Sequence, residues 1–305
     1  MSEEMKNLTT VGEMRVRSGE RPVGSPLVLD ESQVKSLRPD VLSPADIESK
    51  AEVLAVGKAG MSVPTMFVLA IVAGMFIACG ATLFTLVQGD ADLPFAVKRV
   101  MGGACFSVGL MLVVVCGSEL FTGNCLMVCG MGSKKVSLGS MLKNWVVVWV
   151  GNFAGSLLLA GLVFGSQMGA MNDGAVGNAM VSIALSKVTP DMFTLFCKAT
   201  LCNFLVCLAV WMTFGARTLV DKIVACVMPI TAFVACGFEH SVANMFFLFE
   251  GLFAKCAGYG SNLAVSQLDL APIFCNLGIV TLGNIVGGSI LVGLLYWFAY
   301  ARNKA

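Results

Sequence analysis

The sequence predicts an all-α membrane protein with six transmembrane helices, arranged as two inverted three-helix repeats in which helices 2 and 5 are broken. Three observations support this prediction. Of the 305 residues, 57% are hydrophobic and only 13% are charged, and the mean hydropathy is +0.83, a composition typical of polytopic membrane proteins. The apolar residues gather in six long segments, and polar motifs recur in the same order in both halves of the chain.

The N-terminal region precedes the predicted spans. Residues 1–42 are polar and aperiodic, which predicts a flexible cytosolic tail. Residues 43–62 predict an amphipathic helix at the membrane surface, because Ser43 is a favourable N-cap and Pro44 a favourable first residue. The apolar positions of this helix are Ile47, Val53, Leu54 and Val56. Because the first 58 residues hold no apolar core, no cleavable signal peptide is expected.

Six apolar segments follow within residues 63–301, and a straight span needs about 20 residues. The segments cover residues 65–87, 100–128, 144–167, 192–214, 223–249 and 272–300. The second and fifth are longer than the others, and each is interrupted by a polar stretch, CGSELFTGN (116–124) and CGFEHSVANM (236–245). Non-helical backbone at membrane depth is tolerated where protein buries it or where it lines a cavity. These two segments therefore predict broken helices.

The distribution of lysine and arginine predicts the orientation in the membrane. If the N-terminus lies inside, fifteen of these residues fall on the inner side and four on the outer side, with Lys198 inside a span. We therefore expect a multi-pass protein of the cytoplasmic (inner) membrane with both termini cytoplasmic. Residues 302–305 then form a short cytosolic C-terminus.

An internal repeat relates the two halves of the chain. A Gly-x-Glu-x-x-x-x-Asn motif in the second segment recurs in the fifth with an offset of 120 residues. Its members are Gly117, Glu119 and Asn124 in the first half, and Gly237, Glu239 and Asn244 in the second. GNFAGSLL (151–158) likewise recurs as GNIVGGSI (283–290). Because each half has three spans, the second half is inverted, which predicts a site near the membrane midplane between the repeats.

Four ionisable side chains lie inside the predicted spans, where charge is costly and marks function: Glu119, Lys198, Glu239 and His240. The two glutamates are expected to accept hydrogen bonds from backbone N–H groups freed at the breaks. Proton carriage is the alternative for them. Lys198 is expected to extend toward the outer interface, with a substrate role as the alternative.

His240 differs from the glutamates because its repeat equivalent is Leu120, an uncharged residue. Desolvation in an apolar lumen favours the neutral imidazole. Such a group suits the anion of a weak acid, whose charge it can stabilise or neutralise. The alternative is a buried histidine that only satisfies helix carbonyls.

Several classes of function are disfavoured. A net charge of +1 indicates no nucleic-acid partner, and one histidine without paired CxxC motifs indicates no structural metal site. The twelve cysteines lie mostly in apolar runs and are expected to be packing residues. An enzyme using Glu239 and His240 lacks a nucleophile or cofactor motif, so neither catalysis nor a cofactor is expected. A pore for neutral solutes remains an alternative, although paired Asn-Pro-Ala motifs are missing.

Three long motifs resemble the signatures of the formate–nitrite transporter family: CGSELFTGN (116–124), CNFLVCLAVWM (202–212) and GFEHSVANM (237–245). LGNIVGGSILVGLLYW (282–297) is similar to the family's last helix. The resemblance implies an aquaporin-like fold for the channel domain at residues 63–301 and a homopentamer in the lipid bilayer in which each protomer has its own pore. It also implies transport of small monovalent anions such as formate, nitrite or hydrosulfide, with protons as a possible second substrate.

The resemblance also implies roles for individual residues. His240 corresponds to the central pore histidine, Thr122 to the threonine of the broken second helix and Asn203 to the asparagine near that histidine. Lys58 corresponds to the lysine of the inner vestibule and Lys187 to that of the outer one. Constriction residues are also implied: Leu110, Leu120 and Phe233 resemble those of the inner constriction, and Phe106 resembles one of the outer constriction.

The chain departs from the family pattern at three places. KVTPDMF (187–193) lacks a histidine after the outer lysine, and FFLFEGLFAK (246–255) lacks an Ile-Pro pair and contains Glu250. The N-terminal tail is longer than usual. The motifs most resemble the formate branch, so formate is the expected substrate, with hydrosulfide and nitrite as alternatives.

Overall fold

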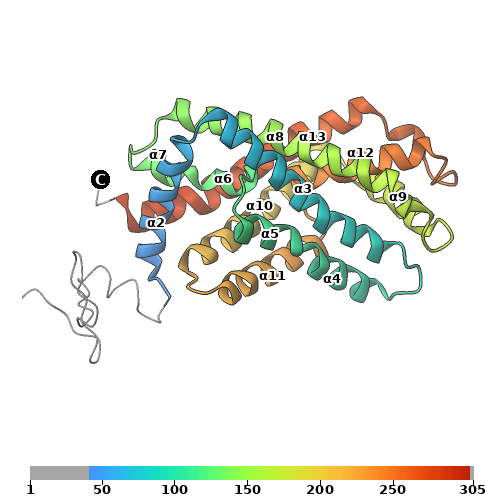
Figure 1. The fold of residues 1–305 in the computed structure, drawn as a ribbon, viewed down its shortest axis with the longest axis horizontal. Coiled ribbons are helices and arrows are strands. Elements are labelled where there is room, and N and C mark those ends of the chain that lie inside the picture. The colour runs from blue at the N-terminus through green and yellow to red at the C-terminus, as the bar shows by residue number, and fades with distance from the viewer. Residues whose placement is uncertain (1–40, 303–305) are drawn as a thin grey trace, which may run out of the picture. The chain divides into compact units, whose positions relative to one another are not determined.

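The structure is a computed structural model that describes residues 41–302. Figure 1 shows that this range is built from helices and connecting loops. The tail predicted over residues 1–42 lies outside the described residues, apart from its last two. Of the predicted C-terminus, residues 303–305 also lie outside them.

The first half of the chain runs from α2 to α8. Its helices are α2 (Pro44–Ala59), α3 (Val63–Gln88), α4 (Phe95–Phe106), α5 (Val108–Cys116), α6 (Phe121–Asn124), η2 (Cys125–Met127), α7 (Val128–Gly132) and α8 (Leu138–Gly165). The second half follows the short helix η3 (Met168–Ala170). Its helices are α9 (Ala175–Val188), α10 (Met192–Gly215), α11 (Leu219–Ala235), α12 (Ser241–Cys256), η4 (Val265–Gln267), α13 (Leu270–Ile285), η5 (Val286–Leu294), which has π-helical hydrogen bonding, and α14 (Leu295–Tyr300).

Five helical ranges among the described residues are long and apolar enough to cross a membrane, judged by length and composition. They are 63–88, 95–116, 138–165, 192–215 and 270–300. The fifth predicted segment, residues 223–249, is shared between α11 with 17 residues and α12 with 16. Helix α9 was not predicted from the sequence, because its 14 residues are shorter than a span and follow the turn-forming stretch Asn172–Gly174.

Two turns interrupt the helices at equivalent places. The 117–120 turn joins α5 to α6, and the 236–240 turn joins α11 to α12. Gly117 has φ +76° and Gly237 has φ +72°, a region that glycine enters without the steric cost of a side chain. The backbone then becomes extended before the next helix begins.

Close helix packing explains the recurring glycines. Helix α3 packs along α8, and α10 packs along α13 and η5. A Cβ atom on Gly155 would lie 2.0 Å from the carbonyl oxygen of Ile71, and one on Gly287 would lie 2.1 Å from that of Thr200. Small residues allow membrane helices to approach backbone to backbone. The repeated motifs at 151–158 and 283–290 thus supply these contacts.

Helix α2 begins as the sequence predicts, since the Ser43 side chain accepts a hydrogen bond from the Asp46 N–H. Of the apolar positions predicted for this helix, Val53 and Val56 are exposed, so the protein itself does not cover them. The buried residues are Glu48, Ala51, Glu52 and Ala55. Glu52 is accommodated there because its carboxylate accepts hydrogen bonds from Ser133 and Lys135, in the loop between α7 and α8.

Candidate functional site

His240 lies buried at the end of the 236–240 turn, where it caps α12. Its Nδ1 atom accepts a hydrogen bond from the Ala243 N–H at 3.1 Å, so this nitrogen carries no proton. The imidazole is therefore neutral, with its proton on Nε2. Nε2 lies 3.0 Å from the Thr122 Oγ1 atom, to which it donates. The backbone of α12 thus holds both the tautomer and the direction of the ring.

Thr122 and Asn203 join His240 from two other helices. Thr122 lies in α6 and is fully buried, and its carbonyl oxygen accepts a hydrogen bond from the Asn203 Nδ2 atom at 3.2 Å. Asn203, in α10, also donates to the Asn284 carbonyl oxygen at 2.7 Å. Within residues 41–302, its hydrogen bonds are with backbone carbonyl oxygens and a cysteine, and none is with His240. Asn203 therefore positions the residue that bonds the histidine.

A lysine pairs with the glutamate of each turn. Lys58 Nζ lies 2.5 Å from Glu119 Oε1, and Asn124 Nδ2 donates to Glu119 Oε2 at 2.7 Å. These three predicted residues, which lie in α2, the 117–120 turn and α6, thus meet at one place.

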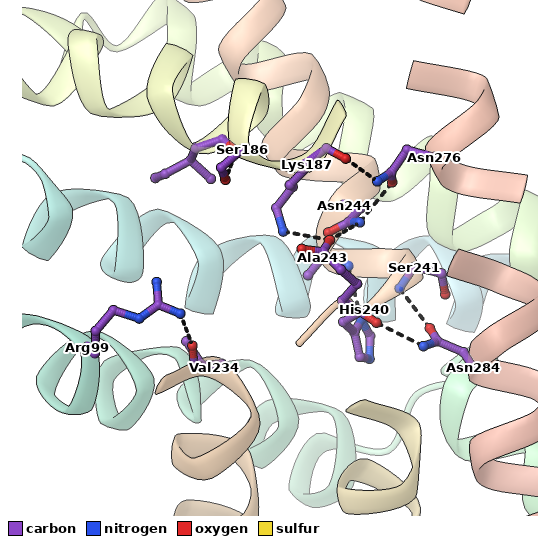
Figure 2. Close-up of polar contacts among 12 residues, drawn as sticks. Arg99, Ser186, Lys187, Val234, His240, Ser241, Ala243, Asn244, Asn276 and Asn284 are labelled. Atoms are coloured by element: carbon purple, nitrogen blue, oxygen red, sulfur yellow. Dashed lines mark hydrogen bonds and ion pairs between the residues drawn. The ribbon is translucent and has the colours of Figure 1, made fainter. Parts of the chain in front are cut away.

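The second half repeats this arrangement around Glu239. Lys187 Nζ lies 3.1 Å from Glu239 Oε2, and Asn244 Nδ2 donates to the same oxygen at 2.6 Å. Figure 2 shows Lys187, Asn244 and Asn276 grouped near His240. Asn276 accepts from Asn244, as Asn144 accepts from Asn124 in the first half.

The glutamates do not have the partners expected from the sequence. Their carboxylates take ammonium and amide donors, and the freed backbone groups are satisfied by two asparagines that were not predicted. Asn152 accepts from the Phe121 N–H and donates to the carbonyl oxygens of Glu119 and Ala70. The Gly-Asn pair that begins each repeated motif, at residues 151–152 and 283–284, could have identified these asparagines from the sequence.

Asn284 makes the same three contacts in the second half. It accepts from the Ser241 N–H at 2.8 Å, and it donates to the carbonyl oxygens of Glu239 at 2.9 Å and Ala199 at 2.8 Å. The bond to Ser241 is visible in Figure 2. Each asparagine is fully buried and bridges the end of a turn to the neighbouring helix. A buried backbone group that lacked such a partner would be costly.

A cavity of about 580 Å³ reaches His240 from one side. Phe106 and Phe233 line it next to the histidine, with their ring centroids 5.8 Å apart in an edge-to-face arrangement. The Phe233 ring also stacks on His240 at 5.9 Å. Leu110 and Leu120 are buried in the same apolar core but do not line this cavity.

Charged side chains also line the cavity: Lys98, Arg99, Lys187, Lys198 and Glu239. Arg99 donates to the carbonyl oxygens of Val234 and Ala235 at the end of α11. Within residues 41–302, no cluster of three or more His, Cys, Asp or Glu side chains could hold a metal ion. All twelve cysteines are free thiols. The arrangement is therefore a positively charged cavity that ends at two phenylalanines and a neutral histidine.

Comparison with known proteins identifies close relatives. Residues 45–298 match the sequence profile of the formate/nitrite transporters. The chain is 38% identical to the formate channel FocA of Escherichia coli K12 over 277 residues, which cover 87% of this chain and 96% of the relative. It is 40% identical to a probable formate transporter of Methanothermobacter thermautotrophicus over 278 residues, which cover 85% and 97%.

Two solved structures are also similar. A pentameric formate channel with formate bound superposes with a TM-score of 0.71 at 35% identity, over 78% of this chain and 97% of that one. An FNT family ion channel superposes with a TM-score of 0.74 at 34% identity, over 83% of this chain and 98% of that one.

Proposed function

Because the chain belongs to the formate/nitrite transporter family, we propose that it is a membrane channel for small monovalent anions of weak acids, with formate as the main substrate. Its curated relatives are named as formate channels and transporters, which leaves no support for an enzyme. The relatives match this chain over nearly their whole length. The activity we assign is therefore that of the channel domain at residues 63–301.

In this proposal the chain crosses the cytoplasmic membrane six times, in two inverted repeats, with both termini cytoplasmic. The second span contains α4 to α7, and the fifth contains α11 and α12. The equivalent ion pairs at Glu119 and Glu239 and the equivalent bridges by Asn152 and Asn284 support the repeat. Helix α2 lies at the cytoplasmic surface, and the assembly is a homopentamer, as in the similar pentameric channel.

The proposed pore passes through the cavity to His240. An anion is attracted by the lysines near each turn, since clefts lined by one sign of charge concentrate ions of the other. It then passes Phe106 and Phe233, where it loses most of its water, and meets the donors of His240 and Thr122. Leu110 and Leu120 form the apolar constriction beyond the histidine, and Lys58 lies in the vestibule that follows.

The observation that carries this function is the neutral imidazole of His240, which the Ala243 N–H holds as an Nε2–H donor in a dry, apolar surrounding. A hydrogen bond to an anion is stronger in such a medium than in water. A neutral donor stabilises the anion without holding it as a full positive charge would. That combination favours passage of one small negative charge.

The function is tested by flux into proteoliposomes that hold the purified protein. Formate, nitrite, hydrosulfide and acetate are compared at about pH 5 and about pH 7.5, on either side of the unperturbed histidine range. We expect formate to move fastest and His240→Asn to change the pH dependence of its flux. Lys143→Leu, on the exposed side of α8, is the control and leaves the profile as it is. An unchanged profile in His240→Asn contradicts the histidine mechanism, and swelling with glycerol but not formate contradicts anion transport.

A further inference from the structure

Positive charge exceeds negative charge in the cavity beside the 236–240 turn. Four cationic side chains line it, Lys98, Arg99, Lys187 and Lys198, against the single carboxylate of Glu239. Lys187 pairs with that carboxylate. Among residues 41–302, the ammonium groups of Lys98 and Lys198 form no hydrogen bond or ion pair, and Arg99 is held by carbonyl oxygens.

These four cations come from three helices, α4, α9 and α10. Lys198 lies in α10, and its carbonyl oxygen accepts the Glu239 N–H at 3.3 Å, which ties its position to the turn. Arg99 lies in α4, and its two bonds to the end of α11 hold the guanidinium near Gly237. Figure 2 shows Arg99 on α4 and Lys187 on α9. Positive charge therefore approaches the cavity from three helices.

The cavity is larger than formate requires. Its volume of about 580 Å³ falls inside the range of roughly 300–1,000 Å³ that is typical of sites for organic ligands. Lys98, Arg99 and Lys198 are half-buried, so the cavity is open to solvent on their side. Ser182, Ser186 and Gln88 add neutral hydrogen-bonding groups to its wall. One formate ion would fill a small part of this volume and balance one charge.

We propose that this cavity binds a small organic dianion with two carboxylates, which blocks the entrance to the pore. Lys198 and Lys98 provide the charge for one carboxylate, and the free N–H groups of Arg99 bind the other, since guanidinium pairs well with carboxylate. The block, but not the binding, rests on the channel function proposed above. The dianion stops at Phe106 and Phe233, because passing them would strip the water from two charges instead of one.

The test compares succinate with butyrate, which has the same number of carbons and one carboxylate. Binding to the purified protein is measured by titration calorimetry, and formate flux is measured in proteoliposomes with either acid on both sides of the membrane. We expect succinate to bind and to slow formate flux, and butyrate to do so about tenfold more weakly, as expected for the loss of one charge-assisted contact.

Variants of Lys198 test whether succinate is bound through its charge or only because it fits the shape of the cavity. Lys198→Leu suits the apolar helix α10 and is expected to weaken succinate binding about tenfold, while butyrate binding changes little. Lys198→Arg keeps the charge and retains binding. Lys143→Leu makes the same replacement outside the cavity and leaves succinate affinity unchanged.

Equal affinity for succinate and butyrate, or unchanged succinate binding in Lys198→Leu, would overturn the proposal. The two proposals fail separately. Formate flux without selective succinate binding refutes the dianion site alone. Selective succinate binding without any formate flux refutes the channel function and the block, and leaves the binding site in place.

Discussion

Asn284 and Asn152 each satisfy three backbone groups with one side chain. Each accepts an N–H from the first residue of the helix that follows a turn, and donates to the carbonyl before that helix and to a neighbouring span. An amide is suited to this task because it carries both donors and an acceptor. The turns therefore depend on residues more than thirty positions away in the sequence.

Replacing Asn284 with leucine is expected to destabilise the protein strongly. The change leaves the Ser241 N–H and the Glu239 carbonyl group without this partner, whereas the Ala199 carbonyl lies inside α10 and keeps its bond within the helix. Each buried unsatisfied group costs about 1–3 kcal/mol. We expect a clear fall in the midpoint of thermal unfolding, measured by intrinsic fluorescence in detergent, and a similar fall for Asn152→Leu. Asn178→Leu is the control, because Asn178 is exposed and accepts one bond, from the Gly260 N–H. Equal midpoints for Asn284→Leu and Asn178→Leu would contradict this role.

The sequence identifies the residues of the turns but not the side chains that form hydrogen bonds with them. The repeated motif identifies Gly117, Glu119, Gly237 and Glu239 from the sequence alone. In the structure each glutamate contacts a lysine and an asparagine. The sequence predicts the wrong hydrogen-bond partners for the two glutamates, because those partners depend on which helices lie next to each other. No local pattern distinguishes an asparagine that bridges a turn from one that packs in a helix.

The glycines of α8 show how closely this helix packs against α3. Glycines on α8 that contact α3 have no room for a side chain, whereas Gly161 on the same helix has nothing within 4 Å of a Cβ atom. The sequence predicts the six apolar segments and both interruptions, because composition and length carry that information. It does not predict α9 or the π-helical η5, because their form depends on tertiary contacts and their periodicity is weak.

Gly155→Ala and Gly161→Ala are expected to act in opposite directions. The new methyl group at Gly155 would lie 2.0 Å from the Ile71 carbonyl oxygen, so α3 and α8 must separate. Overpacking of this kind costs about 1–3 kcal/mol or more. At Gly161 the methyl group meets no atom, and alanine is favoured over glycine in a helix by about 1 kcal/mol. Thermal unfolding of both variants checks this, and a Gly155→Ala variant as stable as Gly161→Ala would refute the close approach.

The contact of α2 with the loop between α7 and α8 is expected to depend on pH. Burial alone would raise the pKa of Glu52, but hydrogen bonds from Lys135 and Ser133 outweigh it and hold that pKa below its usual value of 4.5. A lowered pKa in the folded state means that the stabilisation is complete above about pH 4.5 and is lost as the pH falls below it. Amide hydrogen exchange along α2 should therefore accelerate, relative to α8, as the pH falls from about 4.5 to about 3. Glu52→Gln should remove this dependence, and an equal dependence in the variant would contradict it.

Residues 41–302 have the surface of a membrane protein. Large apolar side chains are exposed along its helices, among them Val146, Leu158 and Leu162 on α8, and lipid or neighbouring protomers must cover them. The family was predictable from three long motifs. The positions of individual helices around the cavity were not, because they depend on the contacts between the two halves.

A homopentamer is the expected assembly. Native mass spectrometry of the detergent-purified protein should give five times the 32.1 kDa mass of the chain, and the complex should dissociate as intact protomers. A monomer or trimer under conditions that keep the protein active would contradict this expectation.

Each turn is completed by partners from its own half of the chain. Lys58, Asn124 and Asn152 all precede α9, so the first half can satisfy its interrupted backbone before the second half has been synthesised. The second half does the same with Lys187, Asn244 and Asn284. The contacts of Thr122 with His240 and Asn203 are among those that require both halves. We therefore expect the histidine site to form only after the second half has been synthesised and has packed against the first.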